Sequence, residues 1–313
     1  RPAAGGRQTV QTDREGAHMM NGGKIEILSY ENENGESLVF SHASVFCPQE
    51  VTGLTDVRST IYSIHSMGQD GDTYVASRIE SREIDISGAI RERDPEKARE
   101  YRRKLARVLN PKLKGVLSYQ YGSFSRIIGC YASSSPVVTK KPQEIYPKFA
   151  VTLSCLDPFW REASERRTDV AAWVGGLEFP VALAATGTMI GYRQRSVIVN
   201  VLNDGDVESG IRAEITAVST VVNPKILNVT TGEFLRFQLT LSAEDTLTVS
   251  TGYGGKAATY THEGTTEDAL KYLDIDSTFL TLDPGDNLIK YEADEGVDNL
   301  QVVVYHNNRY LGV

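Results

Sequence analysis

Alternation of apolar and polar residues dominates the chain and is clearest between Lys148 and Trp160. One face of this extended segment carries Phe149, Val151, Leu153 and Cys155, and the opposite face carries Thr152 and Ser154. Pro158 lacks a backbone N–H donor and disfavours helical angles at Asp157, so the strand is expected to end there. Phe159 and Trp160 follow as a large apolar anchor. We interpret this segment as the exit from a first domain.

Similar patterns predict further strands before this segment. They cover Ile25–Tyr30, Ser37–Phe46 with a run on to Tyr62, Arg82–Ile90 with Ile84 and Ile86 inward, Gly115–Tyr121 and Phe124–Tyr131. Turns are expected at Glu33–Gly35 and Gly122, and a Ser-Ser-Ser-Pro break follows the last strand. The polar loop Ser66–Asp72 contains two glycines between strand-like segments, which predicts the tip of a protruding hairpin.

A single helix of good quality is predicted from about Pro95 to Leu109. Asp94 can cap its N-terminus, Pro95 suits the first helical position, and Asn110-Pro111 ends it. Its apolar stripe is Ala98, Tyr101, Leu105 and Val108, and its outer face carries Lys97, Arg99, Arg103, Lys104 and Arg107. Glu96 and Glu100 precede these cations at helical spacing, which favours paired surface charges or a protein contact over a phosphate site.

The second half shows short strands about every ten residues and no comparable helix. Strands are predicted at Ser196–Leu202, Ile211–Val218, Lys225–Val229, Phe234–Leu239, Thr246–Ser250 and Ala257–Tyr260, with three more before the C-terminus. Turn signals such as Asn203–Asp206, Thr231-Gly232 and Asp283–Asp286 separate them. The chain is therefore expected to be mainly β, with an α+β first domain and an all-β sandwich or jelly roll as the second.

Length and composition support this division. The 313 residues leave room for two domains, and 40% hydrophobic with 24% charged residues is typical of a soluble globular protein. No apolar run approaches the roughly 20 residues that span a bilayer, and no signal-peptide core is visible, so neither secretion by that route nor membrane insertion is expected. The cysteines Cys47, Cys130 and Cys155 are odd in number and lack metal-ligand spacing, which indicates reduced core thiols of a protein folded in the cytoplasm.

Charge is distributed unevenly between the expected domains. Residues 24–163 carry 19 basic and 18 acidic side chains, a net charge of +1, whereas residues 164–313 carry 11 and 21, a net charge of −10. An acidic second domain argues against a nucleic-acid partner, because phosphate binding requires clustered Lys and Arg. Residues 1–23 lack periodicity, and Gly16–Met19 looks like the remnant of an expression tag, so this segment is expected to be a tag or a disordered arm.

Candidate catalytic and metal-binding groups are weak throughout the sequence. His18, His42, His65, His262 and His306 are scattered and form no recognised motif. Asp70 and Asp72 resemble part of a calcium loop that lacks its other ligands, and Gly252–Lys256 lacks the spacing and following helix of a phosphate loop. Asp274 and Asp276 could be glycosidase acids, but acids at strand ends are common. We expect no catalytic, cofactor or metal site and no enzymatic activity.

An ordered succession of turn motifs resembles the distal tail protein family of long-tailed bacteriophages. The motifs are Asn203–Asp206, Asn223–Ile226, Asn228–Glu233, Ala243–Leu247, Asp283–Asn287 and Tyr310–Val313. The junction Asp157–Trp160, after a β-rich half with one charged helix, is also similar to that family. The resemblance extends from about Lys24 to Val313. One departure is Glu244-Asp245 before Thr246, where the family pattern would have Gly-Asp, and a turn still fits there.

The resemblance implies a structural protein of the phage tail tip, assembled in the host cytoplasm. Residues 24–163 would form a hexameric ring, as a β-sandwich with one helix and a protruding hairpin, and residues 164–313 would be a galectin-like sandwich that projects outward. The implied partners are other copies of the chain, the tail tube protein, a hub or fibre protein, and a receptor-binding protein or host cell-wall glycan. Nucleic acid and membrane are not among them.

A carbohydrate-binding module is the alternative function. Tyr253, Tyr260, Tyr272 and Tyr291 could stack sugars on an aromatic face of the second domain. Half-buried strand tyrosines are the simpler explanation, because tyrosine commonly packs its ring and exposes its hydroxyl. The two functions are compatible, since an outward domain of a ring could also contact sugars.

Overall fold

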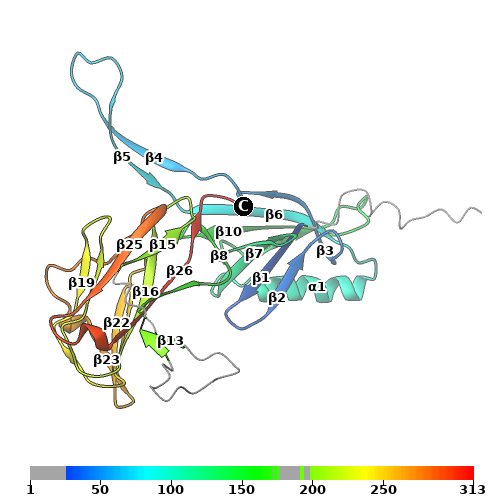
Figure 1. Cartoon of the computed structure of the whole chain (residues 1–313). Coiled ribbons are helices and arrows are strands. Elements are labelled where there is room, and N and C mark those ends of the chain that lie inside the picture. Colours follow the sequence, from blue (N-terminus) through cyan, green and yellow to red (C-terminus); the bar gives the residue numbers. More distant parts are fainter. Residues whose placement is uncertain (1–25, 172, 176–190, 194–197) are drawn as a thin grey trace, which may run out of the picture. The chain divides into compact units, whose positions relative to one another are not determined.

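The computed structural model describes residues 26–171, 173–175, 191–193 and 198–313 (Figure 1). The expected N-terminal arm, residues 1–23, lies outside this part of the chain. The described residues form two compact units. The first contains the residues up to Leu54 together with Arg58–Asp157, and the second contains Thr55–Val57 and Pro158–Val313. The division after Asp157 lies within the segment Lys148–Trp160 and ahead of the boundary expected between residues 163 and 164.

A closed β-barrel forms the body of the first unit. Its strands are β1 (Glu26–Asn32), β2 (Ser37–Phe40), β3 (Phe46–Thr52), β6 (Arg82–Ile90), β7 (Lys114–Tyr121), β8 (Phe124–Ala132), β9 (Val137–Thr139) and β10 (Lys148–Cys155). Pairing runs in the order β8-β7-β1-β2-β3-β6-β10-β9, and β10 also pairs with β8, which closes the circuit. Leu153 faces Ala132 across that closing pair. The resemblance implied a sandwich here, and the structure has a barrel.

Apolar side chains from opposite strands fill the barrel. Ile84 and Ile86 are buried, as predicted from the alternation in Arg82–Ile90. The rings of Phe40 and Phe149 lie 5.8 Å apart, and those of Phe46 and Phe149 lie 6.2 Å apart at right angles. Cys47, Cys130 and Cys155 are buried and free, so the prediction of core thiols is confirmed. A hydrogen bond with Cys155, together with burial, raises the pKa of the Cys130 thiol.

Helix α1 (Pro95–Val108) confirms the predicted helix almost to the residue. The Asp94 carboxylate accepts a hydrogen bond of 3.0 Å from the backbone N–H of Glu96, as a capping residue should. Ala98, Leu105 and Val108 are buried on its inner face. Among the described residues, no helix is both long and apolar enough to cross a membrane.

One strand prediction in the first unit is wrong. The segment Ser37–Phe46 does not run as one strand, because Ser41 and Ser44 form a turn in its middle. The N–H of Ser44 donates to Ser41 O at 3.1 Å, and the single Ser44 hydroxyl proton has Val39 O at 2.7 Å and Phe46 O at 2.8 Å as acceptors, an alternative that serine side chains offer to ladder pairing. The expected run on to Tyr62 is also interrupted, at Gly53, whose φ is +84°. Strand β9 was not predicted.

The second unit contains many short strands, as predicted. They are β11 (Trp160–Arg161), β12 (Arg166–Ala171), β13 (Trp173–Gly175), β14 (Gly191–Arg193), β15 (Ile198–Asn203), β16 (Ser209–Ala217), β17 (Val221–Val222), β18 (Lys225–Asn228), β19 (Phe234–Arg236), β20 (Thr240–Leu241), β21 (Thr246–Ser250), β22 (Ala257–His262), β23 (Thr265–Asp268), β24 (Thr281–Leu282), β25 (Gly285–Glu292), β26 (Leu300–His306) and β27 (Arg309–Tyr310). The described helices of this unit are two 3₁₀ turns, Leu270–Tyr272 and Val297–Asn299.

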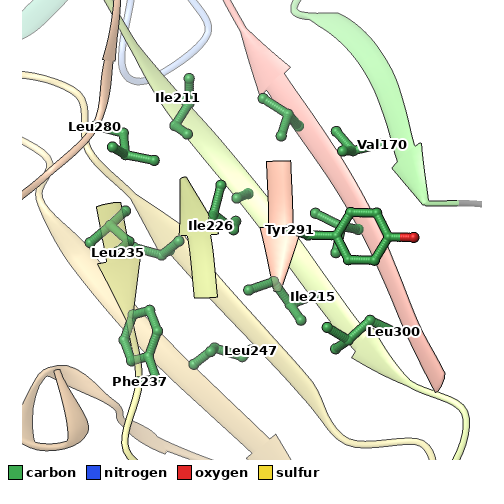
Figure 2. Packing of buried hydrophobic residues seen from close by; sticks show 14 of the residues in the cluster. Val170, Ile211, Ile215, Ile226, Leu235, Phe237, Leu247, Leu280, Tyr291 and Leu300 are labelled. Carbon is green, nitrogen blue, oxygen red and sulfur yellow. The ribbon is translucent and has the colours of Figure 1, made fainter. Parts of the chain in front are cut away.

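Two sheets enclose the core of the second unit. The larger has the order β12-β26-β16-β21-β22-β23, and the smaller has the order β15-β25-β18-β19. Figure 2 shows Ile211, Ile215 and Leu247 of the larger sheet packed against side chains of the smaller sheet such as Ile226 and Leu235. Strand β16 alternates buried and half-buried residues over its whole length, which is the signature of a strand with one face in a core. The mainly-β prediction is confirmed.

Candidate functional site

A long hairpin of the first unit stands apart from the barrel strands. Strands β4 (Ser59–Ile64) and β5 (Thr73–Ile79) pair only with each other among the described residues and are joined by the polar tip Ser66–Asp72. Figure 1 shows the hairpin extending beyond the other strands of its unit. The predicted hairpin tip is thus confirmed. We call residues 59–79 the arm.

Large apolar side chains are exposed along the arm. Their exposed fractions are 65% for Ile61, 49% for Tyr62, 58% for Ile64, 104% for Met67, 62% for Tyr74 and 53% for Val75. Ile61 faces Ser77 and Tyr62 faces Ala76 across the hairpin, and a bulge after Tyr62 places Ser63 opposite Tyr74. Alternation along the strands therefore puts Ile61 and Tyr74 on one face and Tyr62 and Ile64 on the other. Both faces of the arm offer apolar surface.

The root of the arm is held by buried polar contacts. Arg82 is only 4% exposed, and its Nη1 donates to the carbonyl oxygens of Gly53 at 3.1 Å and Leu54 at 2.7 Å. The N–H of Glu80 donates to Arg58 O at 2.9 Å, and the Thr60 hydroxyl donates to the Glu80 carboxylate. These bonds fix the point at which the two strands leave the barrel. The arm is thus an ordered extension at its base, with exposed apolar surface farther out.

Apart from the exposed Met67, the tip of the arm is polar, and several of its side chains bond to one another. Asp72 accepts hydrogen bonds from the Ser63 hydroxyl at 2.9 Å and contacts His65 Nδ1 at 3.2 Å. The Gln69 side chain donates to the Thr73 hydroxyl at 3.0 Å. Asp70 and Asp72 resemble part of a calcium loop, but within the described ranges no group of three or more His, Cys, Asp or Glu residues is placed so that it could hold a metal ion.

One carboxylate of the weak glycosidase candidate, Asp274, has structural partners. Asp274 accepts hydrogen bonds from the Gln238 side chain and the backbone N–H of Asp276, each at 3.1 Å. These bonds lower the pKa of Asp274, so it is a poor candidate for a general acid. The arrangement is that of a hydrogen-bonded turn. Gly252–Lys256 lies in the loop between β21 and β22, as expected for a hairpin turn.

Among the histidines, His262 belongs to a polar cluster of the second unit. Its Nδ1 lies 2.6 Å from Asp245, a 2% exposed carboxylate that also accepts from the Tyr260 hydroxyl at 2.7 Å and from Ser242 N–H at 2.8 Å. The hydrogen bond to Asp245 raises the pKa of His262. Burial alone would raise the pKa of Asp245, but its hydrogen bonds outweigh burial and lower it. The cluster ties β22 to the turn before β21.

The remaining described histidines have other settings. His42 contacts Cys47 Sγ at 3.7 Å, and His65 lies at the arm tip. His306 is buried in β26, where its Nε2 lies 3.1 Å from Leu202 O and burial lowers its pKa. The fifth, His18, lies outside the described residues. No hydrogen bond or ion pair joins any two of the four described histidines, so the structure does not assemble them into a common site.

The four tyrosines of the carbohydrate hypothesis separate into three environments. Tyr291 is 3% exposed in the core (Figure 2). Tyr260 and Tyr272 are half-buried, with their hydroxyls bonded to Asp245 and to Glu267 at 3.0 Å. Tyr253 is 82% exposed. Tyr260 is the half-buried strand tyrosine of the simpler explanation, whereas Tyr272 lies in a 3₁₀ turn and Tyr291 is a core residue. Of the four, Tyr253 alone keeps an exposed ring face.

The outer face of α1 is a charged surface with a shallow recess beside it. Glu100, Tyr101, Arg103, Lys104 and Arg107 line this recess. Arg107 Nε pairs with Glu36 at 2.8 Å, and the Arg107 side chain is 68% exposed. An exposed pair of this kind contributes little to stability. Acidic side chains beside the cations support the expectation of a solvated or protein-contacting face.

Comparison with known proteins identifies two domain families in succession. Residues 33–155 match the phage tail protein RIFT-related domain, and residues 204–310 match the C-terminal domain of the siphovirus-type tail component. The first match contains the arm and helix α1, and the second contains most of the sandwich. No curated protein sequence matches the chain significantly.

Solved structures of phage tail proteins share the fold. The Dit protein of phage SPP1, described as a paradigm of the hub adsorption apparatus of phages that infect Gram-positive bacteria, aligns with a TM-score of 0.61 at 12% identity, over 90% of this chain and 98% of its own. A chain of the activated phage P2 baseplate with Ca aligns with a TM-score of 0.52 at 12% identity, over 92% of this chain and 100% of its own, and the form with Sr gives the same values. With both tail domains present in order and the fold shared over most of its length, the chain belongs to the distal tail protein family of siphophages.

Proposed function

We propose that this phage tail structural protein assembles through its arm into a hexameric ring that joins the tail tube to the hub and receptor-binding proteins. In this proposal residues 24–163 form the ring and residues 164–313 project outward. The protein acts by shape and contact and carries out no catalysis. Its place is the tail tip of the virion, after assembly in the host cytoplasm. Six is the subunit number implied by the family resemblance.

The exposed apolar surface of the arm carries this proposal. An isolated two-stranded hairpin is at best marginally stable in water, and this one shows apolar side chains on both faces. Burying each large apolar side chain against a partner contributes about 1.5–3 kcal/mol before the entropy cost of association. The apolar side chains of the arm are exposed in the single chain, and a partner surface would cover them.

Charge favours a second copy of the chain as that partner. The expected first domain has a net charge of +1, so copies of it can approach closely without strong repulsion. The expected second domain has a net charge of −10 and would repel its own copies. Contacts between copies are therefore expected at the first domain, where the arm begins, and not at the second.

Removal of the apolar side chains of the arm tests the proposal. The triple variant Ile61→Ser, Ile64→Ser, Tyr74→Ser is compared with the wild type by light scattering and negative-stain microscopy at high protein concentration, since ring formation depends on concentration. We expect the wild type to reach six times the 34.5 kDa mass of one chain and the variant to stay monomeric. Ile275→Ser, at a side chain 95% exposed in the second unit, is the matched control and should assemble normally.

Two outcomes would contradict the proposal. A wild-type chain that remains monomeric at high concentration, alone and with its tail partners, would exclude the ring. A triple variant that assembles as well as the Ile275→Ser control would show that the ring forms without the arm. Circular dichroism should first establish that all three proteins are folded.

A further inference from the structure

We propose that a pocket on the outer face of the larger sheet in the second unit binds a neutral saccharide ring. The pocket has a volume of about 200 Å³ and is lined by Glu165, Arg212, Ser250, Tyr253, Tyr305 and Asn307, among others. It is smaller than the roughly 300–1,000 Å³ pockets that hold drug-sized ligands. A single sugar ring suits this size. All of these residues belong to the second unit, so the site is independent of the arm and of ring assembly.

The sheet places the pocket residues on its solvent face. Arg212 of β16 lies directly opposite Tyr305 of β26, and on its other side it lies opposite Ser250 of β21. Their neighbours Ala213 and Val304 point into the core and are fully buried. Because side chains alternate along strands, Arg212, Tyr305 and Ser250 share the outer face. Three strands thus bring a cation, an aromatic ring and a hydroxyl together.

Arg212 is oriented by contacts on several sides. Its guanidinium carbon lies 4.0 Å from the centre of the Tyr305 ring, its Nη2 donates to Glu165 at 2.7 Å, and its Nη1 donates to Glu214. The Tyr305 hydroxyl donates to Glu214 at 3.3 Å. A guanidinium has five N–H donors, so these bonds leave donors for a ligand. Arginine and carboxylate side by side offer both donors and acceptors, which adjacent sugar hydroxyls require.

Hydrogen bonds hold the base of the loop that carries Tyr253. The Thr251 hydroxyl donates to Leu280 O at 2.6 Å and accepts from Ile211 N–H at 2.8 Å, and Gly255 N–H donates to Gly252 O at 3.0 Å. Gly210 and Gly252 approach so closely that a Cβ on Gly210 would lie 2.5 Å from Gly252 Cα. The loop base is therefore ordered while the Tyr253 side chain remains 82% exposed. An exposed aromatic ring on such a loop can pack against the apolar C–H face of a pyranose.

The acidic charge of the second domain favours a neutral ligand over an anion. The pocket itself is lined by Glu165 and by Arg161, Arg212 and Arg309, of which Arg212 stands between the carboxylates of Glu165 and Glu214. The surrounding domain is strongly acidic, with a net charge of −10 over residues 164–313. An anion would approach against this field.

Saturation-transfer difference NMR on the full chain tests the proposal. The probes are the methyl glycosides of glucose, galactose, rhamnose and N-acetylglucosamine, with inorganic phosphate as the anionic probe. We expect at least one glycoside to bind. Tyr253→Ala should weaken its binding roughly threefold to tenfold through loss of the stacking surface, and Arg212→Met roughly tenfold or more through loss of charged hydrogen bonds.

Two matched variants control for general effects. Arg236→Met removes an arginine of equal exposure, 34% against 33%, which is likewise flanked by two carboxylates, Asp274 and Asp294. Tyr74→Ala removes an exposed tyrosine from the arm. Both should bind the glycoside like the wild type. Since Tyr253 lies in an exposed loop, its variant reports on binding even where Arg212→Met perturbs folding.

The proposal is overturned by any of three results. The first is that no glycoside binds, and the second is that phosphate binds but no glycoside does. The third is that a glycoside binds equally well to the wild type, to Tyr253→Ala and to Arg212→Met. None of these results bears on ring assembly, which is measured separately by mass. Conversely, a monomeric chain could still bind the glycoside.

Discussion

Strand β16 of the sandwich and strand β5 of the arm show how little apolar content alone says about burial. Strand β16 reads Ser-Gly-Ile-Arg-Ala-Glu-Ile-Thr-Ala and buries every second residue. Strand β5 reads Thr-Tyr-Val-Ala-Ser-Arg-Ile and exposes six of its seven residues. The difference lies in what covers them, because β16 faces a second sheet and β5 pairs only with β4 within the described chain. Exposed apolar surface of this extent is typical of a surface that binds another protein.

The largest expected effect comes from truncating a core side chain of the sandwich. Phe237 is 1% exposed within the packed cluster (Figure 2). Phe237→Ala removes its burial and leaves a cavity, so we expect a loss of about 3–5 kcal/mol in the free energy of unfolding. Urea unfolding followed by circular dichroism measures this. A loss below about 1 kcal/mol, the size expected at a typical non-core site, would contradict the packing described here.

A smaller effect is expected from adding one methyl group to the barrel. A Cβ on Gly115 of β7 would lie 2.3 Å from the ring of Tyr30, a buried tyrosine whose pKa is raised by burial to about 12. Gly115→Ala should lower the free energy of unfolding by about 1–3 kcal/mol through overpacking.

Gly129 of β8 provides the matched control for Gly115. No atom lies within 4 Å of a Cβ built on Gly129, and its φ is not in the left-handed region. Gly129→Ala should therefore be neutral or slightly stabilising, because alanine restricts the unfolded chain. Equal destabilisation by both substitutions in urea unfolding would show that the contact with Tyr30 is not the cause.

A weaker effect on folding stability, which depends on pH, is expected at the half-exposed His262 cluster. The raised pKa of His262 implies a contribution to folding stability that is complete below its unfolded pKa of about 6.5 and disappears as pH rises through the folded value. The lowered pKa of Asp245 implies a contribution that is present above about pH 3.9 and is lost as pH falls through the folded value.

His262→Gln should remove the loss of folding stability that occurs as pH rises through the pKa of His262. Buried His306, whose pKa is lowered, gives a dependence of opposite sign in the same range, so the effect of His262 is the difference between the two proteins. The denaturant midpoint of the wild type minus that of the variant should decrease between pH 5 and pH 8, the range in which unperturbed histidine titrates. His65→Gln, at the exposed arm tip, is the control and should behave like the wild type. A difference between wild type and variant that increases over this range would contradict the assignment.

The smallest effect on stability is expected in the arm itself. Ile61→Ser and Ile64→Ser remove side chains that are 65% and 58% exposed, so the unfolding free energy of the isolated chain should change by no more than about 0.5 kcal/mol. Because the same substitutions form part of the assembly test, the contrast between unchanged stability and lost assembly would separate a contact role from a folding role. Marked destabilisation in the monomer would mean that the arm packs against its own chain.

Local elements of this protein could be predicted from sequence because short-range physics decides them. Asp94, Pro95 and the apolar stripe set the limits of α1, and alternation set Arg82–Ile90 and Thr246–Ser250 to the residue. The turn motifs were sufficient to indicate the family. The position of the hairpin tip followed from its glycines and polar residues.

Other features depend on contacts between residues far apart in the sequence. Closure of the barrel by β8 on β10, the break at Ser41–Ser44 and the exposure of the arm cannot be deduced from a pattern that a buried strand would share. Likewise, Arg212 and Tyr305 carry no motif, and only strand pairing places them face to face beside Tyr253. Local periodicity determines which side of a strand is apolar, whereas the tertiary structure determines whether anything covers that side.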